Sequence, residues 1–154
     1  GKKQLASVDY RRLIRDFPES KRRAETLYAL GVTQEELGEH DAAGKTYDTF
    51  LKEFGKNPLA PEVRMRKAET VLAGGDVAAA AKAFGAVAAL PDFKAADHAL
   101  DRQAFCMAKL EKFADAAAIY ARLATDFEQG EADDPYGTPF TDEGLSMTFR
   151  LRKA

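Results

Sequence analysis

Residues that could do chemistry are few in this sequence. The only histidines, His40 and His98, have no cysteine or second histidine near them at the spacing of a metal site. The single cysteine, Cys106, would need a histidine partner to act as a nucleophile, and none can be placed beside it. Because Cys106 lies in an alanine-rich helical stretch, a buried core position is favoured. We predict solvated histidines, no metal or cofactor, and a chain that is not an enzyme.

Two further stretches resemble ligand loops only in part. The sequence Gly74-Gly75-Asp76 lacks the lysine and Ser/Thr of a phosphate loop and follows a predicted helix instead of a strand, so we predict a turn. The carboxylates of Asp133, Asp134, Asp142 and Glu143 do not have the spacing of the twelve-residue calcium loop. We interpret them as a solvated acidic loop.

Composition excludes several classes of protein. A chain of 154 residues that is 45% hydrophobic and 31% charged is typical of a globular protein and not of a disordered one. The net charge of −2 and the scattered basic clusters argue against a nucleic-acid surface. No apolar run approaches the roughly 20 residues that cross a membrane, and the chain does not begin with a signal-peptide pattern. One cysteine is compatible with a reducing compartment or with an envelope protein, so the compartment stays open.

A repeat of 36 or 37 residues organises the chain. A small residue followed four positions later by an aromatic recurs at Ala6/Tyr10, Ala43/Tyr47, Ala80/Phe84 and Ala116/Tyr120. Five positions before the alanine stand Gly38, Gly75 and Glu111. The predicted ends of the repeats are Phe17-Pro18, Phe54-Gly55, Leu90-Pro91 and Phe127-Glu128. Three markers in the same register indicate a half repeat at residues 3–18 and full repeats at 19–55, 56–91 and 92–128.

Each full repeat is predicted to form two helices. Ser20 is the expected N-cap of the first of these, Gly38 and Gly75 are expected to end first helices, and Pro58 and Pro61 to open the third repeat. Residues 129–144 contain turn-forming and acidic residues and are predicted to be a loop. Residues 145–152 alternate like a strand, whereas the repeat predicts a further helix, which we favour over residues 145–154.

The small residues predict close helix crossings. Gly31, Ala68 and Ala104 are expected to meet Ala43, Ala80 and Ala116 where two helices of a repeat approach, and Tyr47, Phe84 and Tyr120 to fill the space between hairpins. The half repeat at residues 3–18 suggests a fragment of a longer repeat protein. The apolar Leu5, Val8 and Leu13 are therefore expected to be incompletely covered, and to allow self-association through this end.

These motifs resemble a known family. The pattern L-x-x-L-G-x-x-Q from Leu27 to Gln34, then Gly38, then A-x-x-x-Y from Ala43 to Tyr47 is similar to the tetratricopeptide repeat. The resemblance implies an all-α, right-handed superhelical array of antiparallel helix hairpins with seven or eight helices. The third repeat departs from the pattern at Arg64 and Lys67. The FPES and FGKNPLA junctions resemble exported bacterial proteins of outer-membrane assembly and Tol-Pal accessory proteins, which implies a periplasmic or envelope setting, with the cytoplasm as the alternative.

In this family the outward sides of the first helices build a concave face, and the resemblance implies that a segment of a partner protein binds in its groove, here apolar and acidic. Those sides map onto Glu25, Tyr28, Val32, Glu35, Glu36, Glu62, Met65, Glu69, Leu72, His98, Asp101, Phe105, Ala108 and Lys109. Chaperone-binding relatives carry Lys and Asn here, and their replacement by carboxylates makes an acidic tail a poor partner. We predict binding of a protein or peptide segment with apolar anchors flanked by Lys or Arg, chiefly at Glu25, Tyr28, Val32, Glu35, Met65, Glu69, Leu72, Asp101 and Phe105. The alternative is a rigid spacer or self-association element with no groove ligand.

Overall fold

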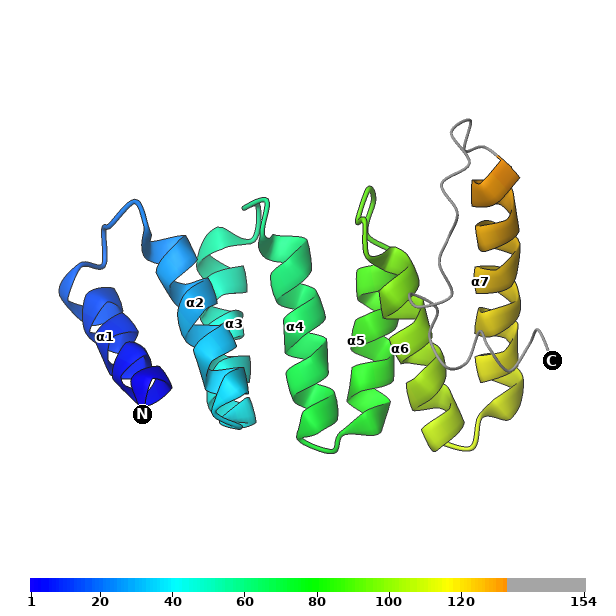
Figure 1. Cartoon of the computed structure of the whole chain (residues 1–154), viewed down its shortest axis with the longest axis horizontal. Coiled ribbons are helices and arrows are strands. Elements are labelled where there is room, and N and C mark those ends of the chain that lie inside the picture. The colour runs from blue at the N-terminus through cyan, green and yellow to red at the C-terminus, as the bar shows by residue number, and fades with distance from the viewer. Residues whose placement is uncertain (133–154) are drawn as a thin grey trace. The chain divides into compact units, whose positions relative to one another are not determined.

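The computed structural model describes the backbone of residues 1–132 and the side chains of residues 1–125, and this part of the chain is all-α. Its helices are α1 (Lys2–Asp16), α2 (Arg23–Glu36), α3 (His40–Phe54), α4 (Ala60–Ala73), α5 (Val77–Ala88), α6 (Ala96–Lys109) and α7 (Phe113–Ala132). Consecutive helices from α1 to α6 contact each other and run alternately up and down (Figure 1). The predicted array of helix hairpins is confirmed.

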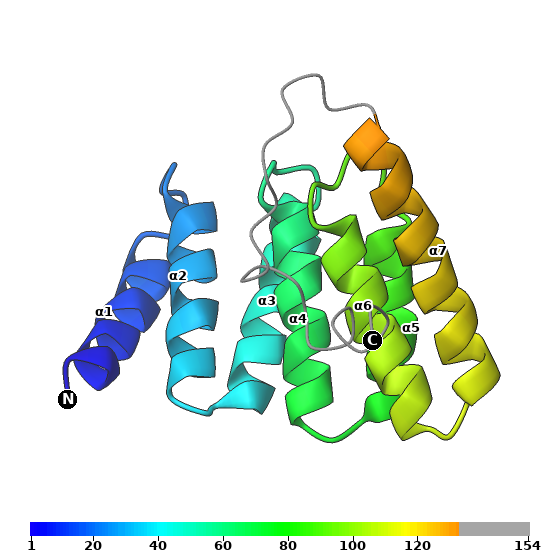
Figure 2. The same ribbon diagram turned by 45° about the vertical axis from the view of Figure 1, so that its right-hand side comes forward.

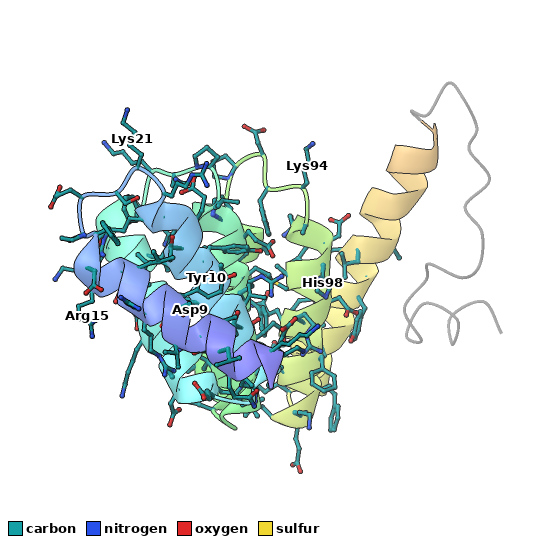
Figure 3. All side chains as sticks on the ribbon, turned by 60° about the vertical axis from the view of Figure 1, so that its left-hand side comes forward. Asp9, Tyr10, Arg15, Lys21, Lys94 and His98 are labelled. Carbon is teal, nitrogen blue, oxygen red and sulfur yellow. The ribbon has the colours of Figure 1, made fainter. Side chains whose placement is uncertain are left out.

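The helices α1 to α6 and the start of α7 belong to one compact unit, Gly1–Leu123, and the remainder of α7 begins a second, Ala124–Ala154. In the first unit, α4, α5 and α6 lie side by side (Figure 2). The loops that connect one hairpin to the next carry exposed lysines, among them Lys21 and Lys94 (Figure 3). The repeat boundaries themselves stay a prediction. Helix α1 lies in the predicted half repeat and α2 to α6 lie inside the full repeats, whereas α7 extends past the last boundary.

Buried side chains form two clusters within the first unit. One contains Leu27, Ala43, Tyr47, Phe50 and Val63 with neighbours from α2, α3 and α4. The other contains Met65, Ala68, Ala80, Phe84, Val87, Ala99 and Cys106 from α4, α5 and α6. Each cluster draws on three successive helices, so a hairpin completes its core only by packing on the next one, as in repeat proteins generally.

The small residues predicted at the helix crossings are buried. Gly31 and the alanines at positions 43, 68, 80 and 104 are buried, the four alanines with no exposed surface, and Ala116 is 4% exposed. A Cβ placed on Gly31 would lie 2.3 Å from Cε1 of Tyr47. The rings of Tyr47 and Phe84 are fully buried, whereas Tyr120 is only half-buried. Gly31 is small because the Tyr47 ring occupies the space where its side chain would be.

Helices α2 and α6 end in the same way with different residues. The amide of Gly38 donates to the Glu35 carbonyl, and the amide of Glu39 donates to that of Gln34. In α6 the amides of Glu111 and Lys112 donate to the carbonyls of Ala108 and Met107. Both are Schellman motifs, which need a left-handed residue, and the φ angles are 75° at Gly38 and 60° at Glu111. Glu111 therefore adopts a backbone conformation that favours glycine.

Replacing Glu111 by glycine is expected to raise the free energy of unfolding. A left-handed conformation costs a residue with a Cβ about 1–2 kcal/mol, and the extra freedom of glycine in the unfolded chain offsets about 0.5–1 kcal/mol of that. Urea denaturation should show a net gain of about 0.5–1 kcal/mol. The matched control is Ala108→Gly in the last turn of α6, which should lose roughly 1 kcal/mol. A loss at both positions would contradict the assigned role of Glu111.

Some predicted boundaries were wrong. Ser20 does not cap a helix: α2 begins at Arg23, and the Ser20 hydroxyl accepts a hydrogen bond from the Arg22 amide within the preceding turn. The last repeat does not stop at Phe127, because α7 continues to Ala132 and includes residues 129–132 of the predicted loop. Phe127 is followed by Glu128 and not by proline or glycine, so nothing ends the helix there. The rest of that loop and residues 145–154 lie outside the described residues.

Helix α1 has an incompletely covered apolar side, as predicted. Leu5 is 68% exposed, Val8 58% and Leu13 45%, and Phe17 just beyond the helix is 61% exposed. Helix α2 packs against α1 and covers one side of it. We refer to the side formed by Leu5, Val8, Leu13 and Phe17 as the α1 apolar side.

Candidate functional site

The residues predicted to bind a partner lie on three helices, α2, α4 and α6. Glu25 and Phe105 are exposed, Phe105 by 38%, and six others are half-buried: Tyr28, Val32, Glu35, Glu69, Leu72 and Asp101. These eight residues are called the first-helix face below. Met65 does not belong to it. Its side chain is 5% exposed and packs with Ala68 and Phe84 in the core, so the prediction that Met65 is available to a partner was wrong.

Arg66 connects α4 to α2 across this face. Its Nε donates to the Tyr28 hydroxyl at 3.1 Å, and its Nη1 donates to Oε2 of Glu35 at 2.9 Å. The Arg66 Nε also lies 3.0 Å from Oε1 of Glu62 one turn earlier in α4. The guanidinium carbon is 5.5 Å from the centre of the Tyr28 ring, within the range of a cation–π contact. Arg66 thus orients Tyr28 and compensates the charge of Glu35.

Arg102 makes the corresponding connection from α6 to α4. Its Nε and Nη2 donate to the two carboxylate oxygens of Glu69 at 2.7 and 2.8 Å, a bidentate pair. These hydrogen bonds raise the pKa of Arg102. Its guanidinium carbon lies 5.8 Å from the centre of the Phe84 ring and 5.1 Å from that of Phe105. Lys109 Nζ lies 5.2 Å from the Phe105 ring centre, so two cations contact this exposed ring.

The two arginines were missed in the sequence, although a signal was present. Arg66 and Arg102 are 36 residues apart, one repeat length, and so occupy the same position in successive repeats. Their acceptors Glu35 and Glu69 were predicted to be free for a basic partner. The structure corrects this, because both carboxylates already accept hydrogen bonds from arginine.

Two buried polar atoms, the Tyr47 hydroxyl and Oε1 of Glu35, lie below this face. The Tyr47 side chain is fully buried, and neither its hydroxyl nor Oε1 of Glu35 has a hydrogen-bond partner among the described residues. Burial, and secondarily the charge of Glu35, raises the pKa of Tyr47. The Glu35 carboxylate therefore has Arg66 on one oxygen and an unsatisfied second oxygen that faces the interior.

The residues considered for catalysis or metal binding are separated. His40 is half-buried at the start of α3, and His98 is exposed on α6 (Figure 3). Cys106 is fully buried, and burial raises the pKa of its thiol. Among the described residues no three His, Cys, Asp or Glu side chains gather as a metal site would require. Within the same part of the chain, no helix has the length and apolar character to cross a membrane. The four acidic residues between 133 and 143 lie outside it.

Comparison with known proteins gives one extensive similarity. A model described as tetratricopeptide repeat matches residues 1–58 and 28–99, and a second model of the same description matches residues 98–129. No solved structure matches the chain. Neither finding points to the outer-membrane-assembly or Tol-Pal proteins among the repeat proteins.

Two further matches cover only about a fifth of the chain each. A stretch of 32 residues, 21% of the chain, is 84% identical to isoleucine–tRNA ligase of Streptomyces avermitilis, and 31 residues, 20% of the chain, are 84% identical to that of Streptomyces coelicolor. The match spans 3% of the length of either ligase. So small a share of those proteins carries no inference about aminoacylation.

Proposed function

Because the chain belongs to the tetratricopeptide repeat family, we propose that it is a non-catalytic module that binds a segment of a partner protein along its first-helix face. The family implies protein partners in general. The observation that carries the proposal for this face is Phe105. It is 38% exposed on α6 while Arg102 and Lys109 flank its ring, an arrangement that core packing does not require.

The chemistry of the proposed partner follows from the charges that remain free. Glu35 and Glu69 are engaged by Arg66 and Arg102, so a basic partner would have to compete for them. The same pairing keeps both arginines from clamping a terminal carboxylate. Glu25 and Asp101 are the acidic residues of the first-helix face that make no hydrogen bond or ion pair with another described residue. We therefore propose that apolar and aromatic side chains of the partner contact Tyr28, Val32, Leu72 and Phe105, with a secondary preference for Lys or Arg near Glu25 and Asp101. An envelope setting stays a proposal that rests only on the junction motifs.

The binding prediction is tested with a Tyr28→Ala/Phe105→Ala double variant. Pull-downs from the source organism with the wild-type chain should recover a partner that the double variant loses by tenfold or more, because large aromatic anchors contribute most of the energy at such interfaces. The matched control is Phe113→Ala, which removes an aromatic side chain that is 66% exposed at the start of α7. Circular dichroism should show all three proteins folded. Equal recovery of every partner by the double variant and the wild type would refute this face.

Self-association is the second candidate, and the α1 apolar side favours it. Four large apolar side chains are between 45% and 68% exposed there, and exposed apolar surface is often part of an interface. We expect sedimentation equilibrium to show association that a Leu5→Glu/Val8→Glu variant abolishes. Ala78→Glu, at an exposed position on α5, is the control that adds charge elsewhere. A wild-type chain that stays monomeric at millimolar concentration would exclude this candidate.

A further inference from the structure

A second surface opens between α4 and α5, away from the residues of the first-helix face. It is a groove of about 490 Å³, lined mainly by alanine, valine and leucine side chains, and we call it the α4–α5 groove. Its lining includes Leu51, Arg64, Val71, Ala83, Val87 and Leu90. Such a volume is within the range of sites that hold a bound ligand or side chains of a partner.

Comparison of the repeats explains why the groove exists. The positions of Arg64 and Val87 are occupied one repeat earlier, 37 residues before, by Leu27 and Phe50, which are 3% and 0% exposed and lie in one buried cluster. One repeat later, 36 residues on, the same positions hold Leu100 and Leu123, which are 7% and 9% exposed. Both neighbouring repeats therefore fill this place with two large apolar side chains, and the third repeat does not.

A smaller difference at a third position enlarges the space further. Ala83 corresponds to Thr46, whose hydroxyl is hydrogen-bonded at 2.6 Å to Oε1 of Gln34, and Gln34 corresponds to Val71. In the second repeat this polar contact closes the two helices against each other. In the third repeat an alanine and a valine stand there and offer only apolar surface.

Two cations lie at the rim of the groove, and one of them, Arg64, has no partner among the described residues. Arg64 is exposed and makes no hydrogen bond or ion pair with any described residue. Lys67, the other cation of the lining, is paired with Asp48. Within the described part of the chain, the groove presents an apolar floor beside one guanidinium that has no partner, a donor suited to a carboxylate.

We propose that the α4–α5 groove receives a helical segment of a partner protein that inserts one or two bulky apolar side chains and places an Asp or Glu against Arg64. The apolar side chains supply the volume that Leu27 and Phe50 supply within the second repeat. The carboxylate supplies the negative partner that Arg64 lacks among the described residues, and complementary charge gives specificity to such a contact. A second copy of this chain docking through its α1 apolar side is disfavoured, because α1 carries five basic and only two acidic residues and so brings a net positive charge toward Arg64.

The probes are two fluorescein-labelled helical peptides of twelve residues that share one Leu and one Phe four positions apart and differ only in flanking residues. One carries Glu on the flank and the other Lys. Fluorescence anisotropy should show binding of the Glu peptide and at least tenfold weaker binding of the Lys peptide. Amide shifts in a ¹⁵N–¹H spectrum of the whole chain should change in residues 64–71 and 79–90 when the Glu peptide is added.

Two variants of the groove and two control variants locate the site. Arg64→Gln should weaken the Glu peptide about tenfold, as expected for the loss of a charge-assisted hydrogen bond. Val87→Phe should abolish binding by filling the groove with the residue found at the same position one repeat earlier. The control Lys82→Gln, at an exposed cation of α5 outside the lining, should bind as the wild type does. The Tyr28→Ala/Phe105→Ala variant should also bind normally, which separates this site from the first-helix face.

The proposal fails if the Glu peptide does not bind, if both peptides bind equally, or if Arg64→Gln and Val87→Phe bind the Glu peptide like the wild type. It also fails if the shifted amides belong to α2 and α6 instead of α4 and α5. Thermal unfolding of Val87→Phe decides whether binding is lost because the groove is filled or because the protein is unfolded. If the new ring fills the groove, the melting temperature should rise or stay the same. If that variant is unfolded, the result for Arg64→Gln alone decides the question.

Discussion

Replacing Tyr47 by alanine is expected to lower the free energy of unfolding by about 3–5 kcal/mol, the range for truncating a large buried aromatic. The Tyr47 side chain is fully buried in the cluster that α2, α3 and α4 share, and its ring lies against Gly31. Removing the ring leaves a cavity between two helices that cannot close without moving both. Urea denaturation measured by circular dichroism gives the value. A change below about 1 kcal/mol would contradict the packing described for this repeat.

Tyr47→Phe is the matched control, because it keeps the ring and removes only the hydroxyl. That hydroxyl is buried with no hydrogen-bond partner among the described residues, so its loss should be neutral or stabilising near pH 7. At high pH the two proteins should diverge. Burial raises the pKa of Tyr47, so above about pH 10 the unfolded chain releases a proton that the folded chain retains. Stability of the wild type should then fall by up to about 1.4 kcal/mol per pH unit more than that of Tyr47→Phe.

Replacing Gly31 by alanine is expected to destabilise the protein strongly although alanine favours helices. The new Cβ would lie 2.3, 2.7 and 2.9 Å from three atoms of the Tyr47 ring, which is buried and has no free direction to move. The cost should reach or exceed the upper end of the roughly 1–3 kcal/mol typical of overpacked cores. Thermal or urea denaturation measures it.

The control for Gly31 is Gly44, another helical glycine. A Cβ on Gly44 would meet only the Thr70 hydroxyl at 3.6 Å, an ordinary contact, so Gly44→Ala should stabilise α3 by roughly 0.5–1 kcal/mol. The double variant Gly31→Ala/Tyr47→Ala should be more stable than the sum of the two single changes implies, because the second change removes the clash of the first. Additive losses would mean that the two residues do not touch.

The sequence predicted the repeat far better than the side-chain contacts of the first-helix face, for a physical reason. The alanines at crossings, the glycines at turns and the buried aromatics recur at fixed positions in every repeat, so their spacing in the sequence reports them directly. The face depends on which long side chain reaches a neighbouring helix. Arg66 reaches Tyr28 and Glu35 from 38 and 31 residues away, distances in sequence that no local pattern expresses.

Two wrong predictions, for Met65 and for the helix end at Phe127, also arose because local sequence patterns do not show what a residue contacts. Met65 was assigned to the face by its place on the helix, yet its side chain is buried in the cluster that α4, α5 and α6 share. The end at Phe127 was inferred from register with Phe17, Phe54 and Leu90, but the proline or glycine that follows those residues is absent there. Helix α7 therefore continues past Phe127, because the repeat register alone does not end a helix.

The two bridging arginines have a consequence for how the array unfolds. In a linear array, each repeat has its own stability and a separate coupling to its neighbour, and the ratio of the two decides whether the repeats melt together or one by one. Gly31 and Tyr47 pack within a single hairpin, whereas Arg66 and Arg102 join one hairpin to the next. Removing both bridges should therefore broaden the transition and lower its denaturant dependence more than it shifts the midpoint. The steepness of melting and the stability of each repeat are set by different side chains.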